Sequence, residues 1–298
     1  MRRRFESTDG MLLLTVVLWA LGIVVTKYLL DHGFQPLAYS AIRYGLATVI
    51  FLVLTYVLER SLRVGGRAQL GQIAIAAFAL LLNQVCFVYA LKLTTATTVA
   101  LMLGTMPVFA GLFGSLAGIE HMTRRFSLAA AVSFCGVGLV ATGSGGDFSG
   151  HLASILVAVG IAATWAAYSV AIAPLMRSYS PYRISSVVLA VMWVPLAIIA
   201  SPQIADQDLD LGWKVWVSFA FAVFGPLVLT NVLWFTAVHR VGPGRASLFA
   251  NLQPFLAAVF AVVLLSEPIS AWQIGGGLLI GAGILLAGRR ETVAAPAE

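Results

Sequence analysis

Two stretches of this chain carry one pattern, ALKLTTATTVALMLGTMPVFAGLFGSLAGIE at residues 90–120 and AVHRVGPGRASLFANLQPFLAAVFAVVLLSE at residues 237–267. The copies are offset by 147 positions, and the offset continues beyond both stretches. The matched positions include Ala90 with Ala237, Pro107 with Pro254, Glu120 with Glu267, and Gly136 with Gly283. Membrane transporters built from two related halves bind their substrate between the halves, so the repeat indicates a solute pathway.

The composition predicts an all-α integral membrane protein. Hydrophobic residues make up 60% of the 298 and charged residues 10%, whereas a soluble domain carries about 25% charged residues. Ten apolar stretches are long enough to span a bilayer, which takes roughly 20 residues. They lie near 10–30, 36–57, 69–91, 95–117, 126–143, 152–174, 182–200, 214–237, 245–265 and 270–288. Their apolar runs are continuous rather than alternating, which argues against a β-barrel.

The segments between these stretches leave no room for a catalytic domain. The longest expected loop, 201–213, contains three aspartates. Cys86 and Cys135 lie within predicted spans, where we interpret them as packing residues rather than a disulfide or a metal pair. The sequence therefore predicts a protein that is not an enzyme and that uses no metal or cofactor.

The net charge of +6 is distributed unevenly along the chain. With the N-terminus inside, the cytoplasmic side receives Arg2, Arg3, Arg4, Arg60, Arg63, Arg67, Arg124, Arg125, Arg177, Arg183, Arg240, Arg245, Arg289 and Arg290. The outer side receives Lys27, Lys92 and Lys214. This asymmetry is typical of the positive-inside rule. We therefore expect the basic residues to orient the protein and contact anionic lipid, not to bind nucleic acid.

The ten spans divide into two halves of five, residues 1–148 and 149–298. Because five is odd, the second half enters the membrane from the opposite side, which predicts an inverted repeat. The first helices of the halves also correspond, since Trp19 matches Trp165 at an offset of 146 and Pro36 matches Pro181 at 145.

These features resemble the EamA-type carriers of the drug/metabolite transporter superfamily. The residues that carry the resemblance are Tyr89 through Pro107 to Glu120, Ala237 through Pro254 to Glu267, Trp19-Ala20 and Arg43-Tyr44. The resemblance covers nearly the whole chain. It implies a ten-helix fold in the bacterial inner membrane, with both termini cytoplasmic, that exports small metabolites. Within the family, the chain is most similar to bacterial exporters of aromatic and other neutral amino acids.

Polar side chains in the middle of spans form the first set of candidate substrate-binding residues. They are Asn83, Gln84, Asn231 and Asn251, accompanied by Thr230 and Gln253. Amides donate and accept hydrogen bonds, which suits a zwitterion with an ammonium and a carboxylate. The alternative is a hydrogen bond between helices, with a free energy of about 1 kcal/mol or less.

Aromatic side chains form the second set. Candidates for the walls of a cavity are Trp19, Tyr44, Phe87, Trp165, Tyr168, Trp234 and Phe249, with Met102 at the position that matches Phe249. Such walls bind rings by stacking and an ammonium by cation–π contact. Packing in the core or against lipid is the alternative. Trp213 and Trp216 lie at a predicted membrane edge and are expected to be interfacial anchors.

Arg43 and the prolines form a third set. Arg43 is the one charged residue well inside a span, where it could reach the interface, bind a substrate carboxylate, or brace helices and gate. Pro107 and Pro254 occupy matched places and Pro226 interrupts another span, so each permits a kink. Gly277 and Gly281 form a GxxxG pattern, suited to packing within the chain or in a homodimer.

No Asp or Glu lies in the middle of a span, which argues against a buried carboxylate that relays protons. The sequence as a whole predicts a secondary transporter, a monomer or homodimer, that exports small neutral and preferably aromatic amino acids by alternating access. An exporter of another metabolite or drug class is the alternative.

Overall fold

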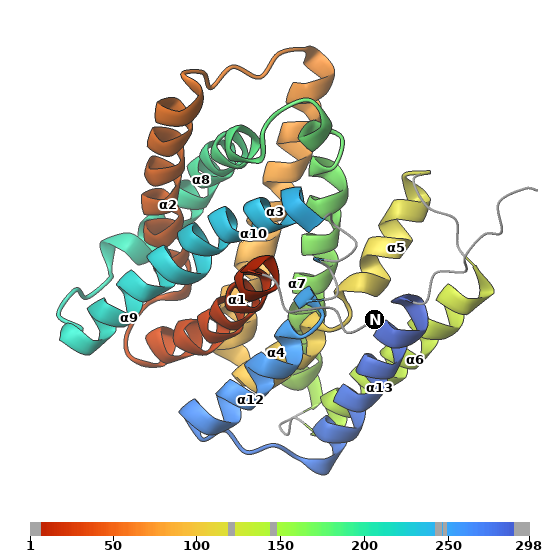
Figure 1. Cartoon of the computed structure of the whole chain (residues 1–298). Coiled ribbons are helices and arrows are strands. Elements are labelled where there is room, and N and C mark those ends of the chain that lie inside the picture. The colour runs from red at the N-terminus through yellow and green to blue at the C-terminus, as the bar shows by residue number, and fades with distance from the viewer. Residues whose placement is uncertain (1–6, 119–122, 144–147, 242–245, 247–248, 289–298) are drawn as a thin grey trace, which may run out of the picture.

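A computed structural model describes residues 7–118, 123–143, 148–241, 246 and 249–288. Within these ranges every regular element is a helix (Figure 1). The elements are α1 (Ser7–Asp31), α2 (Pro36–Glu59), α3 (Arg67–Leu93), α4 (Ala96–Leu103), α5 (Met106–Leu116), α6 (Arg124–Gly143), α7 (Phe148–Ile172), η1 (Leu175–Arg177), α8 (Pro181–Ala205), α9 (Trp213–Val223), η2 (Phe224–Leu229), α10 (Thr230–Val241), α12 (Gln253–Leu265) and α13 (Ala271–Gly288).

Seven of the described helices are long and apolar enough to cross a membrane, or eight if α4 and α5 form one bent span. Gln253–Leu265 and Ala271–Leu286 are shorter apolar helices. In the described residues each predicted apolar stretch coincides with helical structure, but three stretches contain interruptions, one of them a turn at Asn251–Leu252 within 245–265. The stretch 95–117 is divided into α4 and α5, and the stretch 214–237 contains the π-helix η2. The chain is therefore an all-helical membrane protein with broken spans.

Helix α8 is longer than the sequence predicts, because it continues into the expected loop 201–213 as far as Ala205. Pro202 lies inside this extension and has no N–H to donate to the carbonyl of Ile198, four residues earlier. The hydroxyl of Ser201 donates to that carbonyl over 2.8 Å instead. The serine therefore satisfies the carbonyl that the proline leaves free, and the helix passes through Pro202.

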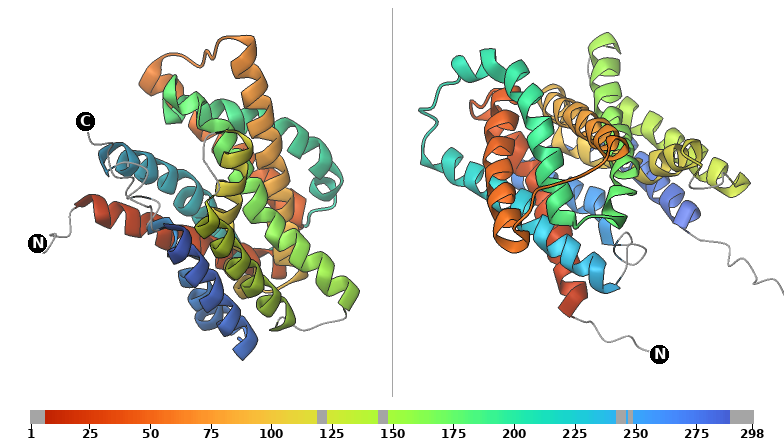
Figure 2. Two further views of the ribbon diagram at one scale, coloured as in Figure 1. Left: turned by 90° about the vertical axis from the view of Figure 1, so that its right-hand side faces the viewer. Right: turned by 90° about the horizontal axis from the view of Figure 1, so that it is seen from above.

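Helices α2 and α8 lie side by side, and each begins with a proline at a matched position of the repeat (Figures 1 and 2). The N-terminus of α2 contacts the C-terminal end of α8, where Gln203 Oε1 accepts from the backbone N–H of Leu37 over 2.7 Å. At the other end of the pair, the carboxylate of Glu59 at the end of α2 accepts hydrogen bonds from Ser180 and Arg183 at the start of α8. The two helices are therefore antiparallel, and each N-terminus is met by an acceptor from the other half.

Helices α6 and α13 form a second extensive pair (Figure 2, left). A Cβ placed on Gly136 would lie 2.6 Å from the carbonyl oxygen of Gly276, so the backbones meet directly. A Cβ on Gly283 would lie 2.8 Å from the carbonyl oxygen of Ala129. These are the same contact seen from each half, because 147 positions separate both Gly136 from Gly283 and Ala129 from Gly276. The paired helices run antiparallel, with an approach that a side chain would prevent.

The remaining glycine pattern also packs within the chain. A Cβ on Gly277 would meet the Leu101 side chain at 3.0 Å, and one on Gly281 would meet Phe255 at the same distance. Both partners belong to this chain, to α4 and α12. The GxxxG pattern therefore has an internal packing role, and it supplies no argument for a homodimer.

Candidate functional site

The predicted residues Trp19 and Trp234 lie together, although 215 positions separate them in the sequence. Their ring centroids are 5.0 Å apart, and Trp19 Nε1 donates over 2.9 Å to the hydroxyl of Thr230. Trp234 and Phe249 pack against the same small cluster around Leu12. The first helix of one half and the third helix of the other are thus joined by aromatic and polar contacts.

Asn83 makes the corresponding contact in the other half. Its side-chain amide donates to the carbonyl of Ile161 over 2.9 Å and to the hydroxyl of Thr164 over 3.2 Å. Asn83 and Thr230 are matched at the offset of 147. Asn83 bridges α3 to α7, and Thr230 bridges α10 to α1, so the same repeat position carries a polar bridge in each half. This geometry favours the helix-bridging interpretation of Asn83.

Gln84, the neighbour of Asn83, differs in one respect. Its amide donates to the Asn83 side chain over 3.0 Å, but its own carbonyl oxygen is buried without a hydrogen-bond partner. The matched residue, Asn231, donates to the carbonyl of Leu227 within its own helix. Gln84 therefore offers an unused acceptor at membrane depth, where a satisfied polar group would be expected.

Tyr44, Tyr168 and Trp165 form another aromatic group. Trp165 and Tyr168 lie one turn apart on α7 with centroids 5.4 Å apart, and Tyr168 packs against the core cluster that contains Tyr44. Trp165 is 38% exposed, while Tyr44 is buried. Phe87 packs against the larger core cluster, in which Met102 is fully buried.

The helix breaks before α5 and α12 lie at matched positions. The chain leaves α4 at Gly104–Thr105 and turns at Asn251–Leu252, again 147 positions later. The backbone N–H of Thr105 donates to Met102 O over 3.0 Å, and that of Leu252 donates to Phe249 O over 2.9 Å. Pro107 and Pro254 follow as the second residues of the new helices. The described α4–α5 break bends the span by 40°.

Arg43 lies at a third break. It is 7% exposed, and its Nε donates over 3.2 Å to the carbonyl of Ala222 in α9. That carbonyl lies four residues before Pro226, which has no N–H to donate to it. Gly22 of α1 packs against the proline ring, since a Cβ there would lie 2.8 Å from Pro226 Cβ. Arg43 therefore replaces a missing helical hydrogen bond at the end of α9, just before the π-helical interruption, a feature often found at functional sites.

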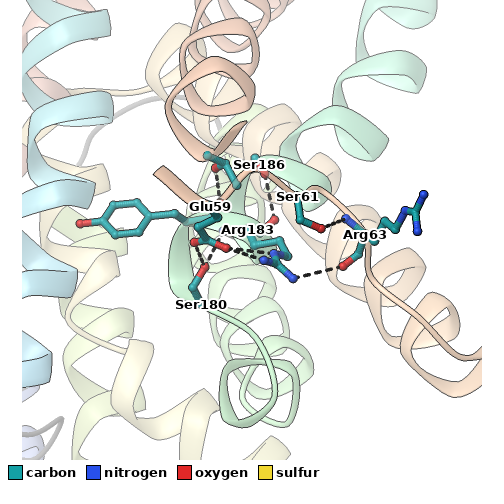
Figure 3. A network of polar contacts seen from close by, with 8 residues as sticks. Glu59, Ser61, Arg63, Ser180, Arg183 and Ser186 are labelled. Atoms are coloured by element: carbon teal, nitrogen blue, oxygen red, sulfur yellow. Dashed lines mark hydrogen bonds and ion pairs between the residues drawn. The ribbon is translucent and has the colours of Figure 1, made fainter. Parts of the chain in front are cut away.

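Polar clusters join the halves at the ends of the helices. On the side predicted to be cytoplasmic, Arg183 pairs with Glu59 through Nε and Nη2, both at 2.9 Å, and Ser180 donates to the same carboxylate (Figure 3). Arg183 Nη1 also donates to the carbonyl of Arg63 over 3.4 Å. The cluster connects the end of α2 and the following loop to the start of α8.

A second cluster centres on Glu267, which follows α12. Its carboxylate accepts from the backbone N–H groups of Ala96 and Thr97 at 2.8 Å each, and from the Thr97 hydroxyl at 2.7 Å. These donors lie in the first turn of α4, where a carboxylate is favourable for both hydrogen bonding and the helix dipole. Its repeat partner, Glu120, lies outside the described residues.

In the described part of the chain, two hollows are lined by residues other than the predicted substrate-binding residues. One, of about 420 Å³, is lined by Tyr56, Arg60, Ser61, Leu62 and Arg63. The other, of about 200 Å³, lies between α2 and α8 and is lined by Ala41, Ile42, Gly45, Leu46, Trp193, Ala197 and Ile204. Among the described side chains, no group of three or more His, Cys, Asp or Glu is placed to hold a metal.

The structure thus joins some predicted residues and leaves others apart. Trp19 meets Trp234, Asn83 meets Gln84, and Trp165 meets Tyr168. Asn251 lies in the turn before α12, half-buried. The partners of Arg43 and Glu267 were not predicted from the sequence. The positions of Pro226 and Pro202 signalled which carbonyls lack a donor, but nothing in the sequence indicated which side chain would supply one.

Comparison with known proteins identifies the family. The model of the EamA-like transporter family matches residues 7–142 and again residues 152–289, so it covers both halves. The chain belongs to the EamA-like transporter family. It is a multi-pass membrane protein and a secondary transporter, not an enzyme. The double match agrees with the repeat that the sequence predicts.

Individual relatives are distant. The uncharacterized transporter YyaM of Bacillus subtilis is 27% identical, over 88% of this chain and 87% of its own. A probable amino-acid metabolite efflux pump of Salmonella typhimurium is 24% identical over 93% and 94%. A probable terminal-alkyne amino-acid exporter of Streptantibioticus cattleyicolor is 25% identical over 94% and 92%.

A solved crystal structure also superposes on this chain with a TM-score of 0.65. It covers 96% of this chain and 99% of its own at 18% sequence identity, which shows a shared fold.

Proposed function

We propose that this EamA-like transporter exports small neutral amino acids, with aromatic side chains favoured, by alternating access. Ten spans in an inverted arrangement of residues 1–148 and 149–298 would surround the pathway in a bacterial inner membrane, with both termini cytoplasmic. The antiparallel packing of α6 against α13 supports the inversion, because these helices occupy equivalent places in the two halves.

The observation that carries the proposal is the pair of matched helix breaks at 104–105 and 251–252. Broken spans free backbone groups at membrane depth, and transporters use such groups where they line a cavity. The carbonyls of Met102 and Phe249 accept the backbone hydrogen bonds that close the turns at the two breaks. Pro107 and Pro254 then act as hinges when the halves move against each other, and Arg43 braces the third break.

Aromatic and amide groups near these breaks determine the substrate in this proposal. Trp19, Trp234 and Phe249 form one wall, and Tyr44, Trp165 and Tyr168 form another. Met102 and Phe87 complete the apolar lining, while Gln84, Asn83, Asn231 and Asn251 meet the polar backbone of an amino acid. The names of two relatives, an amino-acid efflux pump and an amino-acid exporter, support this substrate class.

Counterflow in proteoliposomes tests the proposal. Vesicles loaded with unlabelled phenylalanine, tryptophan or leucine should accumulate labelled phenylalanine transiently, and vesicles without protein should not. A panel of nucleosides, sugars and cationic drugs serves as the comparison. Exchange of those solutes without exchange of any amino acid would support the alternative, an exporter of another metabolite or drug class.

Single-cysteine labelling tests the inverted arrangement. Reagents that do not cross the membrane should reach cysteines placed in the α2–α3 and α7–α8 loops from the same side. That side should be the cytoplasm, because both loops carry the predicted inward arginines. Labelling of these two loops from opposite sides would contradict the proposed topology.

A further inference from the structure

Arg43 is a buried cation that the described structure surrounds with neutral groups. Its Cζ lies 5.7 Å from the ring centroid of Tyr39 and 5.6 Å from that of Tyr44. Its Nε donates to the neutral carbonyl of Ala222. The ion pairs in the described ranges join Lys27 to Asp31 and Arg183 to Glu59, and neither involves Arg43.

A cation at this depth favours an anion. A charged side chain within a membrane is costly unless it is paired, and arginine remains charged at any physiological pH. Cation–π contacts and one carbonyl offset part of this cost. A carboxylate would offset more of it, because it carries the opposite charge and accepts two parallel hydrogen bonds from a guanidinium.

The hydrogen bond to Ala222 also orients the guanidinium. The bond to the carbonyl that Pro226 leaves free uses Nε alone, so the edge formed by Nη1 and Nη2 is not engaged by it. That edge presents two parallel N–H donors, one from each nitrogen, and suits a carboxylate in a planar, bidentate arrangement. Tyr44 beside it packs in the same cluster as Tyr168, which stacks with Trp165. The cation therefore adjoins one of the two aromatic groups assigned to the substrate.

We propose that Arg43 binds the carboxylate of the transported molecule, so that the substrate of this carrier is an acid or zwitterion rather than a solute without a carboxylate. This inference rests on the proposed function, whose aromatic amino acids carry such a group. Binding there places the substrate between α2 of one half and α9 of the other. A substrate bound there also contacts the side chain that stabilises the π-helical break. Substrate binding is therefore coupled to the conformation of that break.

Analogues that lack the carboxylate test this inference. In counterflow of labelled phenylalanine, unlabelled phenylalanine should compete more strongly than phenylalaninamide by on the order of 10–100-fold, the value of charge-assisted hydrogen bonds. In Arg43→Gln the two competitors should become equal within about twofold, the residual preference expected without those bonds. A variant that transports less but keeps the full preference for the acid overturns the proposal. Arg177→Gln, which changes an exposed arginine, is the control and should keep the preference.

Arg43→Lys covers the case in which the glutamine variant does not fold. Lysine keeps the charge but lacks the planar pair of donors, so the preference for the acid should fall without disappearing. An unchanged preference in this variant overturns the proposal.

A binding measurement separates this inference from the proposed function. The purified protein should unfold at a higher temperature with phenylacetate than with phenylacetamide, and Arg43→Gln should abolish the difference. Stabilisation by phenylacetate without amino-acid exchange would sustain the carboxylate site and refute the amino-acid substrate. Equal effects of both compounds on the unmodified protein would refute the carboxylate site, even if amino acids are exchanged.

Discussion

Arg43 donates a hydrogen bond through Nε to the carbonyl of Ala222, 3.2 Å away, at the point where α9 gives way to the π-helix η2. Pro226 leaves that carbonyl without a helical donor, and an arginine from the other half supplies one. The bond therefore connects the helical hydrogen bond that Pro226 removes in one half to a charged side chain in the other.

Pro226→Ala tests the importance of this connection. Alanine restores an N–H that competes with Arg43 for the Ala222 carbonyl, and the interruption should revert towards a regular α-helix. We expect proteoliposome transport to fall several-fold. The gain of a hydrogen bond and the loss of ring packing against Gly22 should largely offset each other. The unfolding temperature should therefore stay within a few degrees of that of the unmodified protein.

Pro202→Ala is the matched control for this change. Pro202 also frees a carbonyl inside a helix, but the Ser201 hydroxyl satisfies it locally and no residue of the other half takes part. This variant should transport as the unmodified protein does. An equal loss in both variants would mean that any change of a helical proline impairs transport, and the connection through Arg43 would lose its support.

Gly136→Ala should destabilise the pairing of α6 with α13. The new Cβ would lie 2.6 Å from the Gly276 carbonyl oxygen and 2.8 Å from the Ile280 side chain, and backbone cannot yield cheaply. We expect a cost of about 1–3 kcal/mol, measured as a lower unfolding temperature in detergent. Gly138→Ala on the same helix is the control, because a Cβ there meets nothing within 4 Å. If both variants unfold alike, close packing at Gly136 is unimportant.

Much of this architecture could be predicted from the sequence because the determining signals are local. Runs of apolar residues predicted the spans, and the stretches 36–57 and 182–200 begin within one residue of the helices that start at Pro36 and Pro181. The offset of 147 aligned Pro107 with Pro254, whose helices both begin one residue earlier. The extension of α8 past Pro202 was missed, since it depends on the Ser201 hydroxyl bonding within the helix.

The candidate site was less predictable because its contacts join distant parts of the chain. Their positions within predicted spans identified Trp19 and Trp234 as candidates, but their contact depends on how α1 crosses α10. Glu267 was noted as a repeat landmark at the end of a span, and its capping of α4 follows only from tertiary packing. The symmetry of the repeat does link Asn83 to Thr230, so their equivalent bridging contacts could have been inferred from one another.

Glu59 and Arg183 should show energetic coupling between the halves. Each side chain is about one-fifth exposed, and the contact involves two guanidinium nitrogens. In a double-mutant cycle with Glu59→Ala and Arg183→Ala, we expect a coupling of about 1–2 kcal/mol, above the usual range for exposed pairs. The more exposed pair of Lys27 and Asp31 provides the comparison, with less than about 1 kcal/mol expected. Additive effects at Glu59 and Arg183 would mean that the cluster does not hold the halves together.

Glu267→Gln should weaken the attachment of α12 to α4. The amide keeps one oxygen that can accept a hydrogen bond. Its NH2 group would face the N–H groups or the hydroxyl that now donate to the carboxylate. We expect a loss of about 1–2 kcal/mol of stability, visible as a lower unfolding temperature. Asp210→Asn, in the exposed loop after α8, should leave that temperature unchanged. An unchanged temperature in the Glu267 variant would show that the cap contributes little.

Trp165→Ala and Trp213→Ala distinguish a substrate-contacting tryptophan from an interfacial anchor. Trp165 lies in α7 next to Tyr168, 38% exposed, whereas Trp213 begins α9 and is 72% exposed. If Trp165 lines the pathway, its loss should raise the phenylalanine concentration needed for half-maximal exchange by roughly tenfold, as expected for a lost aromatic contact. Trp213→Ala should alter that concentration by less than about twofold, because an anchor at the membrane edge positions the helix without contacting solute. Equal changes in the two variants would place Trp165 against lipid or in the helix packing and remove it from the substrate site.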